Sequence, residues 1–230
     1  MRSITLLCAL AATSAASAQP RTLDFDDLAE GFHGETFTYN GVTFSEVNGI
    51  GGVFPDGSTF DPDYPGEEVI IENATLFYND YPTWGSANNA LTFGGAYIVG
   101  DNLSLGAVSR VTMTLDGLHD AVWFDMAYYE NGPWQGIVYT LDAYLGGSLV
   151  ASQNHTIAGS GDLTSRDNIA LHTFALDGAQ FDSLQFTATF NGQPSAPRIL
   201  IDDLTLNAVP APGAAAVMGV AGFAALRRRR

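Results

Sequence analysis

The chain has 230 residues, of which 25 are acidic and nine are basic; it contains no lysine and a single cysteine. Its formal net charge of −16 excludes a nucleic-acid-binding surface, because phosphate contacts need basic side chains. Hydrophobic residues make up 46% of the chain, which excludes a disordered protein.

The N-terminus has the three parts of a secretory signal peptide. A basic start precedes an apolar run from Ile4 to Ala12, and small residues then lead to Ala16-Ser17-Ala18. The run is shorter than the roughly 20 residues of a membrane-spanning helix. We therefore predict that residues 1–18 are a signal peptide and that the chain is exported. The only cysteine, Cys8, leaves with it, so the exported chain has no disulfide.

Residues 19–208 are predicted to form one all-β domain. Apolar and acidic residues alternate in Leu23-Asp24-Phe25-Asp26, as they do in a half-buried strand. Turn residues separate further short strands, and this pattern favours an antiparallel β-sandwich. The predicted strands are 41–44, 90–93, 108–115, 121–127, 138–145, 148–151, 172–176, 183–190 and 199–206.

Turn chemistry predicts three hairpins within this domain. Asn40-Gly41 is a strong hairpin signal, and Gly146-Gly147 supplies positive φ between two strands. The strands 108–115 and 121–127 flank Asp116-Gly117, so they are predicted to pair with each other.

The C-terminus combines Val209-Pro210-Ala211-Pro212-Gly213 with an apolar stretch, Ala214 to Leu226, and four terminal arginines. As a helix the stretch is about 20 Å long, short of a hydrocarbon core of about 30 Å. The arginines would stay on the cytoplasmic side. We expect a transient membrane stop; an ordinary C-terminal membrane anchor is the alternative.

This tail resembles the PEP-CTERM sorting signal in its two prolines, Pro210 and Pro212, its short apolar helix and its final arginines. Ala211 stands where that family usually has glutamate. The resemblance implies that residues 209–230 are a sorting signal, processed by an exosortase in a bacterium that makes exopolysaccharide. It also implies a location at the cell surface or in the extracellular matrix, with only transient membrane contact.

The strand order resembles the jelly-roll domains of such surface proteins and of carbohydrate-binding modules, through the stretches 23–28, 182–186 and 201–206. In such folds the first and last strands often pair. This pairing would bring Asp26 and Asp27 near Asp202 and Asp203. Such carboxylates repel one another unless a cation intervenes, and calcium is the hard ion that takes oxygen ligands. The four aspartates are a predicted calcium site; alternatively they face solvent or cap turns.

Aromatic residues gather in two further places. Tyr78, Tyr81 and Trp84 lie in one predicted loop, and Tyr128, Tyr129 and Trp134 lie around another. Exposed rings of this kind stack on sugars. We predict a carbohydrate platform at Tyr81, Trp84 and Trp134; the alternative is that these aromatics cover the ends of the core.

Catalytic motifs are lacking in the sequence. The four histidines have no metal-ligand spacing, and neither H-E-x-x-H nor G-x-S-x-G occurs. Glu72 or Glu130 could serve a glycosidase, but no spacing singles out a pair of carboxylates. The leading hypothesis is therefore a non-enzymatic surface or matrix protein, calcium-stabilised and associated with exopolysaccharide. A carbohydrate-binding module with defined glycan specificity is the alternative, and a glycoside hydrolase or lyase is the third hypothesis.

Overall fold

The computed structural model describes residues 19–45, 51–60, 68–75, 84–86, 88–94, 96–100, 102–105, 108–130, 134–159 and 169–210. The predicted signal peptide, Tyr81 and the tail beyond Pro210, Pro212 included, lie outside the described residues. Within them the paired strands are all antiparallel, which confirms the predicted all-β class. In this part of the chain no helix is long and apolar enough to cross a bilayer.

The strands in chain order are β1 (Arg21–Leu23), β2 (Gly31–Phe32), β3 (Phe37–Tyr39), β4 (Val42–Ser45), β5 (Gly52–Val53), β6 (Thr59–Phe60), β7 (Ile70–Asn73), β8 (Asn89–Phe93), β9 (Ala96–Val99), β10 (Asn102–Leu105), β11 (Arg110–Tyr129), β12 (Ile137–Leu145), β13 (Ser148–Thr156), β14 (Ile169–Phe190), β15 (Gln193–Pro194) and β16 (Ile199–Ala208).

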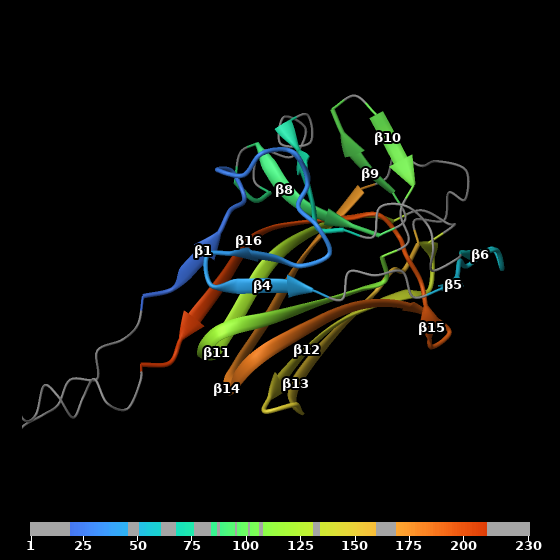
Figure 1. The fold of residues 1–230 in the computed structure, drawn as a ribbon. Helices are drawn as coiled ribbons and strands as arrows, with labels where there is room; N and C mark the ends of the chain where they lie inside the picture. Colours follow the sequence, from blue (N-terminus) through green and yellow to red (C-terminus); the bar gives the residue numbers. More distant parts are fainter. Residues whose placement is uncertain are drawn as a thin grey trace, which may run out of the picture.

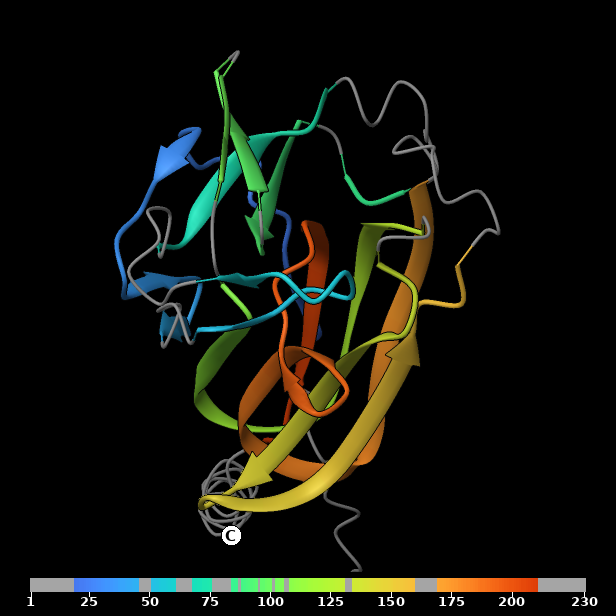
Figure 2. The same ribbon diagram turned by 90° about the vertical axis from the view of Figure 1, so that its right-hand side faces the viewer.

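Two long strands, β11 and β14, pair with each other along almost their whole length (Figures 1 and 2). Their register shifts between Thr114 and Ala121. Before the shift β11 also pairs with β4, and after it with β16; the late half of β14 pairs with β12. Bulges of this kind bend strands and increase their twist. The bent pair therefore belongs to two layers, one with β4, β12 and β13, the other with β16, β8 and β7.

The core lies between these layers. Phe186, in the late half of β14, contacts Phe124 and Phe174 of the other layer at ring-centroid distances of 5.6 and 5.4 Å. All three rings are fully buried. Alternate residues of the long strands point into this core, which confirms the period-two pattern of the sequence. The jelly-roll order of the strands is a more detailed statement than the all-β class, and it stays a prediction.

The hairpins at Asn40-Gly41 and Gly146-Gly147 are confirmed as β3–β4 and β12–β13. The hairpin predicted at Asp116-Gly117 is wrong, because this dipeptide lies inside the single strand β11. Asp116 is held by distant groups: its N–H donates to the Gly41 carbonyl at 3.0 Å, and its carboxylate takes both terminal nitrogens of Arg21 at 2.8 and 3.0 Å. These contacts hold the strand at a bend. Likewise, the predicted strands 172–176 and 183–190 are one strand, β14.

The first and last strands pair as expected, with Leu23 opposite Leu204. Within β16 the φ angle of Asp203 is +51°, and the register with β11 shifts there. The extra residue shifts the alternation of side chains by one position, so that Ile201 and Leu204 both point into the core. Asp202 and Thr205, their neighbours along the strand, point to the opposite, outer face. The doublet of aspartates therefore marks a β-bulge.

Gly94, after β8, shows where the chain requires glycine. Its φ is +116°, and a Cβ atom there would overlap the carbonyl oxygen of Pro197, next to β16. We predict that Gly94→Ala lowers the unfolding free energy by several kcal/mol, since the backbone of Pro197 must move. Gly178, with φ +81° and open space around it, is the matched control: Gly178→Ala should cost only the backbone strain of about 1–2 kcal/mol. Urea denaturation measures both, and equal losses would contradict the close approach.

Candidate functional site

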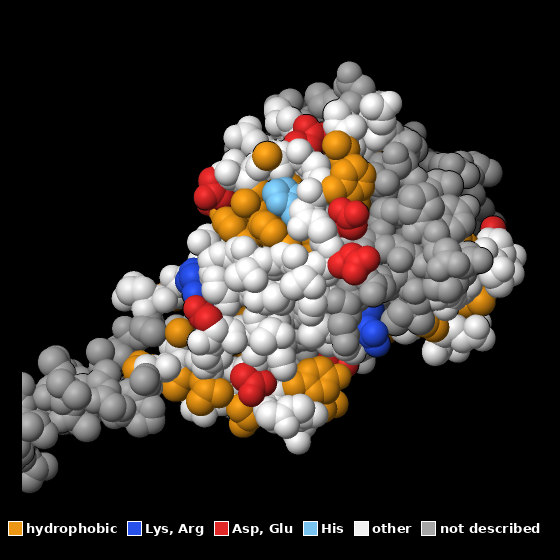
Figure 3. Space-filling model, viewed as in Figure 1, with side chains coloured by type: hydrophobic (Ala, Val, Ile, Leu, Met, Phe, Trp, Pro, Cys, Tyr) orange, Lys and Arg blue, Asp and Glu red, His pale blue; other side chains and the backbone are white. Residues whose placement is uncertain are grey.

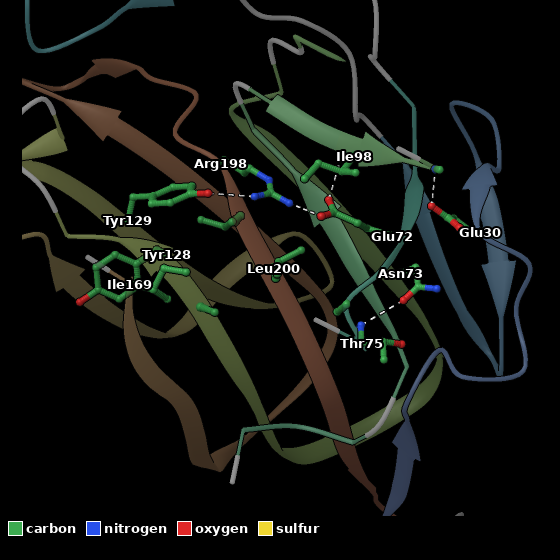
Figure 4. A pocket seen from close by; sticks show the side chains of 14 residues that line it. Glu30, Glu72, Asn73, Thr75, Ile98, Tyr128, Tyr129, Ile169, Arg198 and Leu200 are labelled. Carbon is green, nitrogen blue, oxygen red and sulfur yellow. Dashed lines mark hydrogen bonds and ion pairs between the residues drawn. The ribbon is translucent and has the colours of Figure 1, made fainter. Parts of the chain in front are cut away.

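A cleft of about 670 Å³ opens on the outer face of the β16 layer (Figure 4). Outward side chains from four strands of this layer form its floor: Glu72 of β7, Leu200 of β16, Tyr129 of β11 and Ile169 of β14. Strand β8 lies between β7 and β16. The hairpin β9–β10 contributes Ile98 to its wall, as Figure 4 shows.

An ion pair crosses this cleft. Nη2 of Arg198 binds Oε1 of Glu72, and Nη1 of Arg198 donates to the hydroxyl of Tyr129 at 3.0 Å. The backbone N–H of Ile98 donates to Oε2 of Glu72 at 3.1 Å. These three bonds fix the guanidinium between a ring and a carboxylate.

Both charges of this pair are largely removed from water, with side-chain exposures of 14% for Arg198 and 4% for Glu72. Burial raises the pKa of the Glu72 carboxyl, and the charge of Arg198 opposes that rise. A buried charge without its partner would be strongly destabilising, so each side chain needs the other. The Nε of Arg198 finds no hydrogen-bond acceptor among the described residues, which leaves a buried donor in the cleft.

The rim of the cleft is polar. Glu30 accepts a hydrogen bond from the N–H of Gly100 at 2.5 Å through its carboxylate. Asn73 accepts one from the N–H of Thr75 at 3.0 Å, and both of these side chains are exposed. The cleft therefore joins an aromatic floor to groups that both donate and accept hydrogen bonds.

A pair of histidines lies behind the cleft, on the core side of the sheet, to which the ring of Tyr128 points. The hydroxyl of Tyr128, a lining residue, lies 2.6 Å from Nε2 of His155, and the His155 ring stacks on His172 at 3.9 Å and 20°. Burial lowers the pKa of both histidines, and for His172 the neighbouring His155 lowers it further. Burial, with the charge of Glu130, raises the pKa of Tyr128 to about 12.

The predicted calcium ligands lie near the paired terminal strands, but each has a protein partner. Asp26 accepts from the N–H of Asn89 at 3.0 Å, and Asp27 accepts from the hydroxyl of Tyr39 at 2.5 Å. Both aspartates lie in the turn that follows β1. Among the described residues no group of three acidic or histidine side chains is arranged to hold a metal. Calcium binding stays a prediction.

On β16, Asp202 is fully buried and accepts from the N–H of Ser86 at 2.8 Å, and from that of Asp203 at 2.8 Å. Burial raises the pKa of Asp203, and the charges of Asp125, Asp24 and Asp26 raise it further, although a hydrogen bond to Ser86 opposes them. Acidic groups therefore gather here, while Asp202 itself ties the segment 84–86 to the sheet.

The predicted carbohydrate platform is not assembled by the described residues. Trp84 is only 2% exposed and packs among small apolar residues and Leu200, so the structure corrects its predicted role as an open stacking surface. The physical reason is the bond between Ser86 and Asp202, which holds this segment down on the sheet. Trp134 is half-buried against Phe54 at a centroid distance of 5.9 Å. Tyr81 lies outside the described residues.

The sequence patterns pointed to Glu72 and Tyr129 but not to Arg198, which joins them in the structure. One signal could have found it: residues 19–208 contain only four basic residues, all arginine, among 25 acids. Such a rare cation is a candidate for a specific role.

No family model matches this chain, and no curated protein matches it. Among solved structures, the K2 cleaved adhesin domain of Lys-gingipain is similar, with 13% identity, TM-score 0.45 and coverage of 83% of this chain and 98% of that one. The module CBM27-1 of Caldicellulosiruptor saccharolyticus, solved with mannohexaose, has 14% identity, TM-score 0.45 and coverage of 85% and 100%. With TM-scores below 0.5, these likenesses carry no argument about function.

The histidine pair predicts acid-sensitive stability. A histidine whose pKa is lower in the folded than in the unfolded chain stabilises the fold above the unfolded pKa of about 6.5, and this contribution is lost as the pH falls through the folded pKa. We expect the melting temperature to fall between about pH 7.5 and about pH 5, and to fall less in His155→Phe. The matched control is Thr156→Val, an exposed change next to His155 on β13 that removes no titratable group and should leave the slope of the wild type. Thermal melts at several pH values measure it, and equal slopes in both variants would contradict the prediction.

Proposed function

We propose that this chain is an exported, non-enzymatic protein of the cell surface or extracellular matrix that binds an uncharged glycan in its cleft. The observation that supports this most is the buried pair of Arg198 and Glu72 beside the ring of Tyr129, in a cleft of about 670 Å³.

The chemistry of the cleft matches that of sugar hydroxyls, which both donate and accept hydrogen bonds. Arg198 offers N–H donors only, and the exposed carboxylate of Glu30 at the rim offers acceptors. An aromatic ring beside Arg198 gives an apolar surface for a sugar face. Small-ligand sites combine these features: an apolar lining with a few fixed polar groups.

Charge favours an uncharged ligand. Arg198 and Glu72 neutralise each other, and Glu30 adds a negative charge at the rim. Acidic side chains are dispersed over the face shown in Figure 3. With four arginines against 25 acids in residues 19–208, the domain repels an anionic polymer.

Binding rather than hydrolysis is proposed because both carboxylate oxygens of Glu72 are engaged, one by Arg198 and one by the N–H of Ile98. A glycosidase needs one carboxyl that gives up a proton and a second that acts as nucleophile or base. Release of reducing ends from a bound polysaccharide would overturn this part of the proposal.

The predicted signal peptide and the predicted sorting tail support the proposed location. The last described residue, Pro210, is exposed just after β16, where a processing enzyme of the exosortase type could reach the following segment. A more specific proposal is that the bound glycan is the exopolysaccharide around the cell, so that binding it would hold the protein in the extracellular matrix.

Affinity electrophoresis of the purified full-length chain through gels that contain glucomannan, hydroxyethylcellulose or dextran tests the cleft. Retardation by at least one of them is expected, and Tyr129→Ala should weaken it about tenfold, since the ring supplies about 1–1.5 kcal/mol of stacking. Tyr144→Ala is the matched control, because Tyr144 is also half-buried but lies in the other layer. If no gel retards the wild type, or if both variants behave alike, the cleft is not the glycan site.

The calcium expectation has its own test. Excess calcium should raise the melting temperature of the wild type by several degrees relative to a chelator, because a ligand that binds only the native state stabilises it by about 2.7 kcal/mol at a hundredfold over its dissociation constant. Asp26→Asn should abolish the rise. An unchanged melting temperature in the wild type would leave Asp26 as a turn residue without an ion.

A further inference from the structure

Beyond the cleft, the outer face of the same layer carries an exposed tryptophan, Trp123 of β11. It is 38% exposed although it lies at the middle of a strand between two others. Its cross-strand neighbours, Ala175 on β14 and Thr205 on β16, are small, so neither of them places a bulky side chain beside the indole. A large ring in the open on a sheet is a candidate contact surface.

Trp123 and the cleft lie on one face because side chains alternate along a strand. Trp123, Asp125 and Tyr129 are an even number of residues apart on β11, and the register with β14 has no shift between them. Six residues of strand place the indole about 20 Å from Tyr129. That distance exceeds a single sugar ring but suits a chain of several.

Strand β14 provides an open path between the two rings. Ile169 lines the cleft, Leu171 is 42% exposed, and Thr173 is exposed further along the same face. Over this stretch β14 pairs only with β11 among the described residues, so no further strand walls in the path. The segment 84–86 lies over Leu200 and Asp202 of β16, and Trp84 belongs to the same apolar cluster as Ala127 of β11, against which Ile169 packs. Leu171 and Thr173 stay exposed beside this cluster, so the path runs along β14.

The path has polar groups along its length. The hydroxyl of Thr173 donates to Oδ1 of Asp125 at 2.7 Å, which orients this carboxylate near the indole. Among the described residues, none donates a hydrogen bond to its second oxygen, Oδ2. Asp125 and the exposed Asp177 make the path acidic. An anionic polymer or membrane is therefore repelled, whereas an uncharged polyhydroxylated chain can stack and donate hydrogen bonds.

We propose that Trp123, Asp125, Thr173 and Leu171 form a second subsite, continuous with the cleft, so that the ligand is a linear, uncharged polysaccharide lying along β14. This inference rests on the proposed glycan binding in the cleft and adds the length of the ligand to it. A short oligosaccharide fills the cleft alone, and only a longer chain reaches Trp123.

The test compares ligand lengths, with glucomannan and mannohexaose as long probes and mannobiose as the short one, by affinity electrophoresis and calorimetry on the full-length chain. Trp123→Ala should weaken binding of the long probes about tenfold and leave mannobiose unchanged, whereas Tyr129→Ala should weaken all three. Thr173→Ala, an exposed and structurally mild change, should weaken the long probes in the same direction. Tyr144→Ala, at a half-buried aromatic residue of the other layer, is the control and should change none of them.

The outcomes separate the two proposals. If Tyr129→Ala weakens binding but Trp123→Ala does not, the cleft binds sugar and the extended subsite is wrong. If none of the probes binds the wild type, both are wrong. If Trp123→Ala instead turns a dimer into a monomer in size-exclusion chromatography with glycan binding unchanged, the indole belongs to a contact between two copies and the extended subsite is again overturned.

Discussion

The pairing of β11 with β14 is the interaction on which both layers of this protein depend. One ladder of hydrogen bonds runs from Arg110 opposite Thr187 to Tyr129 opposite Ile169, and the bulged region bends it from one layer into the other. Because the same two strands line both sides of the core, the layers cannot shift independently. The outer face that carries the cleft is thereby fixed by contacts made in the opposite layer.

Two buried carboxylates hold further segments of the chain against the outer face of the sheet. Glu72 and Asp202 both point away from the main core, and each is covered by a different segment of chain. The hairpin β9–β10 meets Glu72 through Ile98, and the segment with Ser86 meets Asp202. A buried carboxylate demands partners, so these two acids specify where the covering segments lie. The first of these covers also supplies Ile98 and Gly100 to the lining of the cleft.

Local chemistry made part of this structure predictable. The turns at Asn40-Gly41 and Gly146-Gly147 depend on backbone conformations that neighbouring residues dictate, and they were expected correctly. Asp116-Gly117 carries a similar turn signal but lies inside strand β11, where the side chain of Arg21, 95 residues away, binds Asp116. No pattern of neighbours contains that contact.

The same distinction explains the site. The aromatic residues and the acids were visible as residue types, yet which of them meet was not. Arg198 and Glu72 are 126 residues apart, and the burial of Trp84 follows from a bond between Ser86 and Asp202, 116 residues apart. The pairing of the first and last strands was expected from a family resemblance, whereas the bulge at Asp203 required the register itself.

The direction of β16 has a consequence for how this protein is presented. The strand begins at Ile199, beside the cleft and next to Arg198, and ends nine residues later at Ala208, a distance of about 30 Å. Strand β1 lies alongside its last residues, so both described ends of the chain leave from the same pole (Figure 1). A chain held at its C-terminal end would therefore carry its cleft at the distal pole, turned toward whatever approaches from outside.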